Sequence, residues 1–197
     1  VAVVSTDPIT GVIENIGWFA IHIACNDLAA NGAEPVGVLL TILLPPETEI
    51  EFLQGVVKDA SQAAKELNIE ILGGHTEVTK AVNQPVLSTT ALGKTKKNEL
   101  IIPANIAPEQ DIVLTKGAGI EGTAILAAAK YTELQQTVDY NVLEQAKEFS
   151  KMLSVVPESR LEADFGVTAM HDVTEGRVLG VLYEVAKTAS GGCLVNN

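Results

Sequence analysis

The chain alternates between short runs of β-branched or apolar residues and longer stretches in which apolar residues recur every three to four positions. The short runs are typical of strands, and the longer spacing is typical of helices that bury one face. In the first half of the chain, this pattern predicts strands at residues 1–6, 36–44, 69–72 and 86–92 and helices at residues 13–31 and 53–67. Strands and helices that alternate in this way indicate an α/β or α+β fold.

Several residues mark where these elements are expected to begin or end. Asp7 and Pro8 follow the first run, and because proline has no N–H for a ladder, we expect the first strand to end there. Residues 36–44 are almost continuously apolar, which predicts a strand that is buried on both faces. Thr48 and Glu51 have the spacing of a capping box and predict the start of the second helix.

The second half of the chain begins after a polar connection, residues 93–108, which contains two prolines and a cluster of lysines. We expect a domain boundary there, with one domain at residues 1–107 and a second at residues 108–197. In the second domain, the pattern predicts strands at residues 111–115 and 167–170 and helices at residues 121–130, 142–153 and 175–189. The organisation is therefore that of two small α/β domains.

The composition is that of a folded protein with a strong acidic excess. The 197 residues include 25 acidic and 13 basic side chains, which gives a net charge of −12, and 47% of the residues are hydrophobic. This hydrophobic content excludes an intrinsically disordered chain, and the negative charge argues against binding to nucleic acid or to an anionic membrane surface. The longest apolar run, residues 35–46, is too short to cross a bilayer, which needs about 20 residues.

The cysteines and the two ends of the chain add further expectations. Cys25 and Cys193 are too few for a disulfide framework, which favours a reducing compartment, and we expect a cytoplasmic protein. Cys25 lies in an apolar helical pattern and is expected to be buried. The chain opens on Val1 inside a strand-like run and closes where another strand is expected to begin, so we interpret it as a fragment of a longer protein.

Four polar groups interrupt the apolar pattern, each near the end of a predicted element. They are residues 5–7, 26–27, 73–77 and 171–176. Each has an ordinary explanation on its own: a turn residue before proline, a solvated helix face, a glycine turn after a strand, and a helix cap. Element ends are also where α/β proteins expose functional groups, and carboxylates at several of them predict a site for Mg²⁺ and the phosphates of a ligand.

A glycine-rich turn is the most regular motif in the chain. Gly117, Gly119 and Gly122 give a G-x-G-x-x-G sequence between a predicted strand and a predicted helix, as in dinucleotide-binding folds. The acidic residue expected about 20 positions later is Asp139, but it lies in a helical pattern and does not end a strand, which argues against such a fold. The motif is still compatible with a turn that binds phosphate at a helix N-terminus. A NAD-binding oxidoreductase is retained as a less favoured alternative.

Five segments together carry a resemblance to a known family. They read STDPIT, CNDLAANGAEPVGVLLTILLP, GGHTEVT, TKGAGIEGTAIL and HDVTEGRVLGVLYEVA, and they span nearly the whole chain in this order. The sequence resembles the aminoimidazole ribonucleotide synthetase-related superfamily, and NDLAANGAEP is the most specific single piece. Members of this superfamily include that synthetase, thiamine-monophosphate kinase, selenophosphate synthetase and the carbamoyl dehydratase of nickel–iron hydrogenase maturation.

The resemblance implies a two-domain α/β fold and a set of ligand-binding residues. The N-terminal domain would pair with its twin through a barrel-like sheet, and ATP and Mg²⁺ would bind at the dimer and domain interface. The implied metal ligands are Asp7, Asp27 and Glu77. The implied nucleotide contacts are Asn26, Asp27, Gly73, Gly74, His75 and Thr76 in the first domain and Gly117, Gly119, Gly122 and Thr123 in the second. The implied catalytic contacts to the reacting phosphate and the substrate are His171 and Asp172.

The resemblance also implies an activity and partners. Family members use ATP to phosphorylate a substrate oxygen, and we expect such an enzyme nearest the hydrogenase-maturation branch. It is expected to form a homodimer and to act on a small-molecule or thiocarbamate-type substrate, with a protein partner left open. The alternatives are the synthetase or thiamine-monophosphate kinase branch and a non-catalytic nucleotide-binding dimer module. One departure is Arg177, which follows Gly176 where the family has a second glycine, and we expect its side chain to point to solvent.

Overall fold

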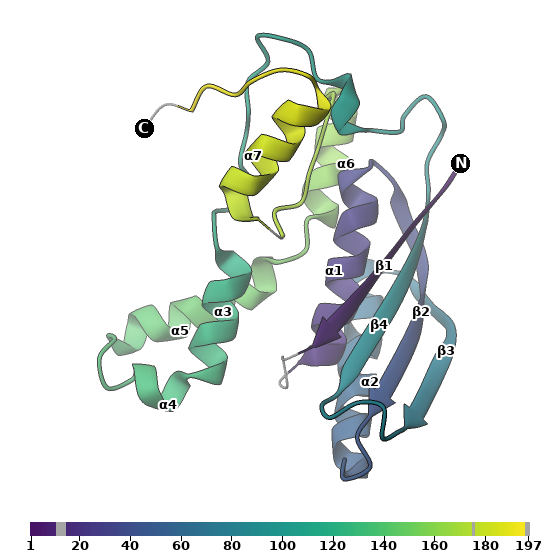
Figure 1. Cartoon of the computed structure of the whole chain (residues 1–197), viewed down its shortest axis with the longest axis vertical. Helices are drawn as coiled ribbons and strands as arrows, with labels where there is room; N and C mark the ends of the chain where they lie inside the picture. The colour runs from purple at the N-terminus through teal and green to yellow at the C-terminus, as the bar shows by residue number, and fades with distance from the viewer. Residues whose placement is uncertain (11–14, 175, 196–197) are drawn as a thin grey trace. The chain divides into compact units, whose positions relative to one another are not determined.

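The computed structural model of the chain describes residues 1–10, 15–174 and 176–195 (Figure 1). It divides into two compact units, the first comprising Val1–Ala29 with Ala33–Thr95 and the second comprising Ala30–Gly32 with Lys96–Asn197. The predicted starts of two helices, at residues 13 and 175, lie outside the described residues. Within the described part of the chain, no helix combines the length and the apolar character that a bilayer crossing requires.

The first unit is built on one mixed four-stranded sheet. Its strands are β1 (Ala2–Thr10), β2 (Glu34–Leu44), β3 (Glu70–Val78) and β4 (Val86–Lys94). They lie in the order β1-β4-β2-β3, with β4 antiparallel to both β1 and β2, and with β3 parallel to β2. The two edges of the sheet are therefore β1 and β3.

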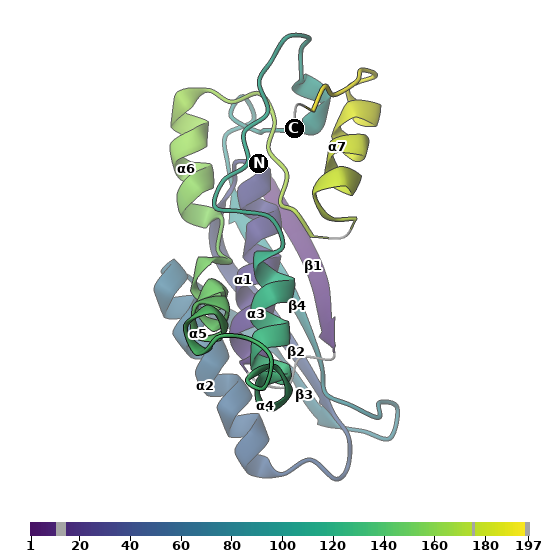
Figure 2. The same ribbon diagram turned by 90° about the vertical axis from the view of Figure 1, so that its left-hand side faces the viewer.

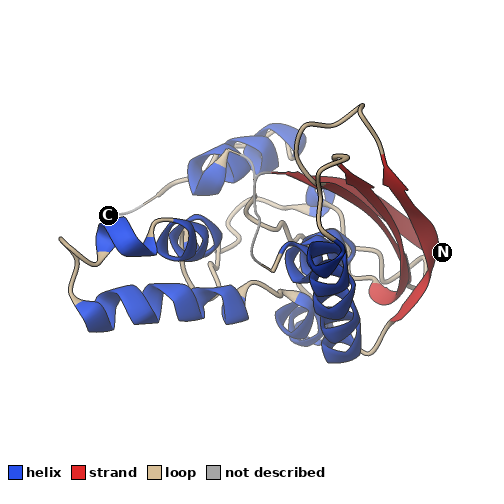
Figure 3. Ribbon diagram, turned by 90° about the horizontal axis from the view of Figure 1, so that it is seen from below, coloured by secondary structure: helices blue, strands red, loops and turns tan. Residues whose placement is uncertain are grey.

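Two helices cover one face of this sheet. The helices α1 (Ile16–Ala30) and α2 (Ile50–Leu67) lie on the same side of the strands (Figure 3). Gly17 lets them cross closely, because a Cβ atom built there would lie 2.1 Å from the carbonyl oxygen of Val56. The core contains fully buried apolar side chains, among them Ile16, Ile21, Leu28, Val38, Leu44 and Leu87. Burial of each such side chain stabilises the fold by about 1.5–3 kcal/mol.

The opposite face of the sheet carries exposed apolar side chains. We call it the open face and define it by Val4, Val36, Leu39 and Leu72, whose exposed fractions are 59%, 45%, 42% and 51%. The prediction that residues 36–44 are buried on both faces is therefore wrong for the single chain, because α1 and α2 shield only one side of β2.

The first strand continues through the residues that were expected to stop it. β1 includes both Asp7 and Pro8, and Pro8 pairs with Ser88 of β4. Proline is tolerated here because β1 is an edge strand, so one side of it has no ladder that needs an N–H donor. The predicted end of the strand at Asp7 is therefore wrong.

The glycine pair of the third strand lies inside the strand and forms no turn. Gly73 and Gly74 pair with Leu39 and Leu40 of β2, directly after a register shift that follows Val38. At Gly74, φ is 153°, and a Cβ atom would lie 1.9 Å from the carbonyl oxygen of Leu40. The predicted turn is therefore wrong, and Gly74 instead allows β3 to approach β2 closely.

The start of α2 also differs from the expectation. Its N-cap is Glu49, whose side chain makes no capping hydrogen bond. The predicted capping box of Thr48 and Glu51 is therefore wrong, because it requires a helix that begins one residue earlier.

The second unit contains short helices. They are the 3-10 helices η1 (Pro103–Asn105) and η2 (Phe149–Met152) and the α-helices α3 (Ile120–Ala129), α4 (Tyr131–Leu134), α5 (Tyr140–Glu148), α6 (Val156–Phe165) and α7 (Arg177–Thr188) (Figure 2). Three of them match predicted helices, whereas α4 and α6 were not predicted. The strands predicted at residues 111–115 and 167–170 are wrong, because neither segment shares a ladder with a strand among the described residues.

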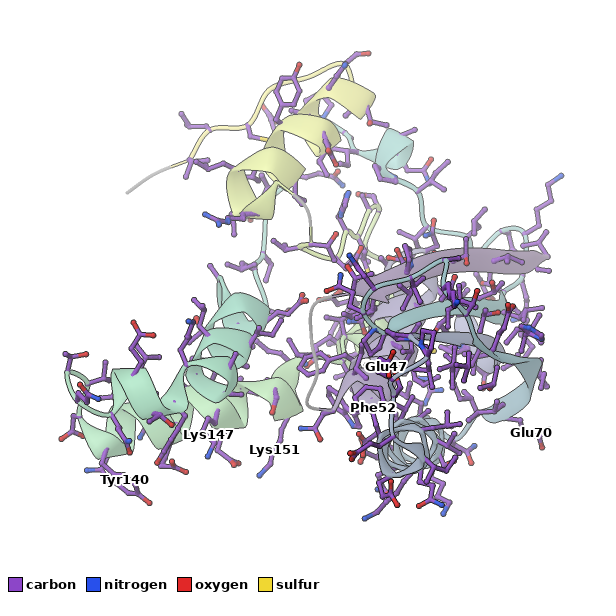
Figure 4. The ribbon with its side chains drawn as sticks, turned by 60° about the horizontal axis from the view of Figure 1, so that its bottom comes forward. Glu47, Phe52, Glu70, Tyr140, Lys147 and Lys151 are labelled. Atoms are coloured by element: carbon purple, nitrogen blue, oxygen red, sulfur yellow. The ribbon has the colours of Figure 1, made fainter. Side chains whose placement is uncertain are left out.

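A pair of helices forms the best-packed part of the second unit. The helix α3 packs against α5 and η2, with Ala124, Ala127 and Leu143 buried. Lys147 of α5, labelled in Figure 4, lies close to α4, where the ring centroid of Tyr131 is 4.6 Å from its Nζ. The small alanines let α3 and α5 approach closely, and the cation over the ring connects α5 to α4.

Candidate functional site

The end of α1 and the helix-covered side of β1 bring two predicted carboxylates to one region. Asp27 of α1 accepts a hydrogen bond from the hydroxyl of Ser5 on β1. Asp7 lies two residues after Ser5 and therefore on the same face of the strand. Asn26 precedes Asp27 and is buried, with 7% of its surface exposed. The structure thus places Asp7 and Asp27 on the same side of the sheet.

Cys25 adjoins this region but is not a nucleophile. It is fully buried in α1, as its apolar surroundings predicted. Burial, and to a smaller extent the charge of Asp27, raises the pKa of its thiol to about 12. The thiol therefore stays protonated at neutral pH and acts as a small apolar side chain.

The second predicted group, residues 73–77, lies at the other edge of the sheet, in a strand whose residues are all exposed. Nε2 of His75 lies 3.4 Å from Oε2 of Glu77, and the two side chains share a face because they are two residues apart. Thr76 lines a small pocket of about 220 Å³ between β3 and α2, together with Leu40 and Ile42 of β2. The predicted nucleotide loop is therefore an edge strand beside an apolar pocket.

The two groups do not meet within one chain. β4 and β2 lie between the edge strands, and three spacings between neighbouring strands amount to about 14 Å. Among the described residues, no three His, Cys, Asp or Glu side chains lie close enough together to hold a metal ion. Asp7 and Asp27 are therefore grouped near β1, whereas Glu77 belongs to β3.

The glycine-rich turn of the second unit starts α3. Gly119 is the N-cap of this helix and has φ 73°, a left-handed conformation that favours glycine, and its carbonyl accepts the N–H of Thr123. At Gly117 and Gly122, by contrast, a Cβ atom would meet no other atom within 4 Å. Packing within the described chain does not require glycine at these two positions, so their backbone is accessible to a ligand. The residues before the turn form no strand, so the context of a dinucleotide fingerprint is absent.

Lys116, directly before this turn, was not singled out by the sequence. Its Nζ donates to the carbonyl oxygen of Ser154 and lies 2.9 Å from Oε1 of Glu158 in α6. The side chains of Lys116 and Glu158 are only 19% and 26% exposed. A lysine beside a glycine turn is a typical phosphate ligand, but this one anchors the turn to α6.

The residues predicted to be catalytic precede α7. Nδ1 of His171 lies 2.6 Å from the carbonyl oxygen of Asp172 and 3.7 Å from its carboxylate. Nε2 of the same ring lies 3.5 Å from Oε2 of Glu184 in α7. Glu184 was missed because no spacing in the sequence connects it to the HDVTEG segment. The arrangement is an imidazole between two carboxylates, which can accept and return a proton.

Two domain models of one family match the chain in sequence order. The N-terminal domain of AIR (aminoimidazole ribonucleotide) synthase related proteins matches residues 1–95, and the C-terminal domain of the same proteins matches residues 107–196. The chain belongs to the AIR synthase-related family. The resemblance carried by the five sequence segments is thereby confirmed.

Two relatives in the AIR synthase-related family match most of this chain. A putative hydrogenase expression/formation protein of Methanocaldococcus jannaschii is 26% identical over 181 residues, which are 92% of this chain and 52% of that protein. Carbamoyl dehydratase HypE of Cupriavidus necator is 26% identical over 184 residues, which are 92% of this chain and 50% of that protein. The chain therefore spans about half the length of these relatives. Phosphoribosylformylglycinamidine cyclo-ligases, a selenide, water dikinase and thiamine-monophosphate kinases are similar to it as well.

Solved structures of the family share the fold. A chain of the HypE–HypF complex has a TM-score of 0.82 at 23% identity, covering 96% of this chain and 62% of that chain. HypE in complex with ATP has a TM-score of 0.60 at 24% identity, covering 66% of this chain and 41% of that chain. The expected α/β fold of this family is thereby confirmed.

Proposed function

We propose that the protein is an ATP-dependent enzyme that phosphorylates a substrate oxygen, in the hydrogenase-maturation branch of the AIR synthase-related family. The observation that carries the proposal is Asp27, the aspartate of the NDLAANGAEP segment, which Ser5 holds on the same side of the sheet as Asp7. The relative named as a putative hydrogenase expression/formation protein supports the branch, as does a similar structure described as hydrogenase maturation protein HypE, and the ATP in that structure supports the nucleotide.

Mg²⁺ fits the chemistry of this donor set. Asp7 and Asp27 offer carboxylate oxygens, the ligands that this ion prefers, and the hydroxyl of Ser5 orients one of them. The bound ion would neutralise charge on the phosphates of ATP. In the second unit, the open backbone at Gly117 and Gly122 offers N–H groups to a phosphate.

The remaining metal ligand, Glu77, would come from a second copy of the chain. Within one chain it lies at the opposite sheet edge from Asp7 and Asp27, whereas two copies joined edge to edge would set β3 of one beside β1 of the other. Both edge strands have backbone groups outside the ladder that such a join would pair. We therefore propose a homodimer with two composite sites.

The open face supports the same dimer. Val4, Val36, Leu39 and Leu72 form an apolar surface that runs across β1, β2 and β3, and such surfaces mark interaction sites. Two sheets that close on each other would bury these side chains in a barrel-like core. The interface should be large, roughly 2,000 Å² or more, as in obligate dimers.

Calorimetric titration with Mg·ATP tests the nucleotide site. Asp7→Asn and Asp27→Asn should each weaken binding at least ~10-fold, because each removes a charge-assisted contact of ~1.5–3 kcal/mol. Glu47→Gln removes the same charge at an exposed carboxylate beyond the end of β2 and serves as the control (Figure 4). Unchanged affinity in both aspartate variants would contradict the proposal.

Mixing two weakened variants tests whether the site is composite. Asp27→Asn and Glu77→Gln should each weaken Mg·ATP binding at least ~10-fold in their own homodimers, so that few sites are filled at a ligand concentration near the wild-type Kd. After unfolding and refolding together, heterodimers carry both substitutions in one site and none in the other, so about a quarter of the wild-type sites should return. A site formed within a single chain predicts no recovery at all.

The substrate, the partner and the compartment complete the proposal. We propose a small-molecule or thiocarbamate-type substrate and a protein partner, because one similar structure is a complex of HypE with HypF. Cytoplasmic location is consistent with Cys25 and Cys193, which are both free thiols. A nucleotide-binding dimer without turnover is the alternative, and release of ADP with and without candidate substrates separates the two.

A further inference from the structure

A cluster of aromatic and polar side chains joins the two helices of the first unit. We call it the α1–α2 clasp and define it by Trp18, His22, Gln62 and Glu66. Trp18 and His22 are four residues apart on α1, as Gln62 and Glu66 are on α2, so each pair lies on one side of its helix. The rings of Trp18 and His22 stack with centroids 3.9 Å apart and an angle of 36° between their planes.

Glu66 is the centre of the clasp. Its Oε2 accepts from Nε1 of Trp18 at 2.8 Å and lies 3.3 Å from Nε2 of His22, while its Oε1 accepts from Gln62 at 3.1 Å. Burial opposes ionisation of this carboxyl group, but the hydrogen bonds from Trp18, Gln62 and His22 outweigh it and lower the pKa of Glu66. A charged carboxylate on α2 therefore links two side chains of α1.

Burial on α1 is not confined to one side of the helix. Of its 15 residues, 11 are buried, and they occur all round the helix. A helix of this kind has no polar stripe that would face solvent in only one rotation. The close crossing at Gly17 and the directional hydrogen bonds from Trp18 and His22 to Glu66 therefore both restrict the rotation of α1 against α2.

The clasp acts on the helix that carries the candidate ligands. His22 and Asn26 are four residues apart and so lie on the same side of α1, and both are buried. Over one or two turns a helix rotates as a rigid body. The rotation of α1 at His22 therefore also sets the directions in which the side chains of Asn26 and Asp27 point.

We propose that Glu66 is a positioning residue, which fixes the rotation of α1 through Trp18 and His22 and thereby holds Asp27 against Ser5. The inference rests on the proposed function only where it takes Asp27 to bind Mg²⁺ for ATP. The orientation of α1 itself is a property of the free protein.

Hydrogen exchange of the whole chain tests this orientation without any ligand. Glu66→Leu removes both acceptor oxygens and should raise exchange of the α1 amides at least ~tenfold, while the amides of β4 stay as in the wild type. Glu66→Gln keeps an amide oxygen for Trp18 and should remain within ~threefold of the wild type. Glu51→Leu introduces the same side chain at an exposed position in the first turn of α2 and is the matched control.

Trp18 provides a second readout, because it is the only tryptophan in the sequence. Loss of the hydrogen bond at Nε1 should shift its emission maximum in Glu66→Leu and leave it unchanged in Glu66→Gln and Glu51→Leu. If Glu66→Leu does not fold, Trp18→Phe removes the same hydrogen bond but keeps an aromatic ring, and it should loosen α1 in the exchange experiment.

The outcomes separate this inference from the proposed function. Faster exchange confined to α1, together with Mg·ATP affinity at least ~tenfold weaker in Glu66→Leu, supports both. If the wild type binds no Mg·ATP but Glu66→Leu still loosens α1, the proposed function fails and the positioning role stands. Unchanged α1 exchange in Glu66→Leu, or an increase spread evenly over the first unit, overturns the positioning role.

Discussion

Individual glycines in this chain have two different explanations, which only their surroundings separate. Gly74 is required by the fold, because any side chain there would collide with Leu40 of the neighbouring strand. Gly117 and Gly122 have open space where a Cβ atom would stand. The sequence shows all three as members of glycine motifs, yet the first preserves sheet geometry and the other two leave a backbone accessible.

Gly74→Ala is expected to destabilise the protein strongly. The added methyl group must displace the backbone of β2 and adopt a φ that is unfavourable for alanine, so the free energy of unfolding should fall by about 2 kcal/mol or more. Gly55→Ala is the control: this residue lies in α2, and a Cβ atom added there would have no neighbour within 4 Å, so the change should stabilise by about 0.5–1 kcal/mol. If urea denaturation shows the same change in the free energy of unfolding for Gly74→Ala and Gly55→Ala, the requirement for glycine at position 74 is contradicted.

Arg177→Gly is expected to stabilise the protein. Arg177 is exposed, as expected, but has φ 56°, directly after Gly176 with φ 72°. The left-handed conformation costs a non-glycine residue about 1–2 kcal/mol, and glycine would remove this strain. Glycine would also raise the entropy of the unfolded chain, which lowers the gain by about 0.4–1 kcal/mol. Thermal denaturation should show a net gain of about 0.5–1 kcal/mol, whereas Arg177→Lys should change little. A destabilised glycine variant would mean that the arginine side chain makes a contact of its own.

At the scale of the elements, the sequence correctly predicted the helices and strands whose local pattern is enough to specify them. The helices α2 and α3 and the strand β4 lie within a few residues of their predicted positions, because their apolar spacing or composition is locally sufficient. The strands expected at residues 111–115 and 167–170 have suitable side chains but no neighbour among the described residues. A strand depends on its partner for hydrogen bonds, which no local pattern can reveal.

The candidate site was predicted as a list of residues, and its arrangement was not. The family segments pointed to Asp7, Asp27 and Glu77, but nothing in them states that β4 and β2 separate the two edges of the sheet. The contacts of Lys116 with Glu158 and of Trp18 with Glu66 join positions that are far apart in the sequence. Long-range pairs of this kind leave no spacing signal in a single sequence.

A double-mutant cycle should show that Lys116 and Glu158 connect the glycine turn to α6. Lys116→Met and Glu158→Gln should be coupled by about 1–2 kcal/mol in the free energy of unfolding, because the pair is largely shielded from solvent. The exposed pair Lys130 and Glu133, whose side chains are 61% and 75% exposed, is the control and should be coupled by at most about 0.5 kcal/mol. A coupling energy as small as that of the control pair would contradict the prediction that Lys116 and Glu158 hold the glycine turn against α6.

At the scale of the whole molecule, the first unit has more apolar sheet surface than its own two helices cover. α1 and α2 shield one side of the strands, and the open face remains exposed. A folded chain rarely leaves such a surface without a partner. The same arrangement sets the predicted metal ligands at two separate edges, so the surface and the divided site both favour a second copy.

Leu39→Glu is expected to prevent dimer formation. Light scattering of the wild type at micromolar concentration should give twice the 20.7 kDa of one chain, and a charge at the centre of the open face should give the single-chain mass. Leu126→Glu, at another exposed leucine in α3, should leave the mass unchanged. A wild type that stays monomeric at this concentration would contradict the dimer.

The exposed edge strand β3 has a consequence for the life of the protein in the cell. In the proposed homodimer, a newly made chain without its partner subunit would present a strand with one unpaired edge next to apolar side chains. Surfaces of this kind promote aggregation and recognition by chaperones and proteases. Assembly would hide that surface. The abundance of the protein should therefore depend on its own rate of synthesis. At a low rate of synthesis, chains would be degraded before they dimerise, whereas at a high rate most chains would dimerise and persist.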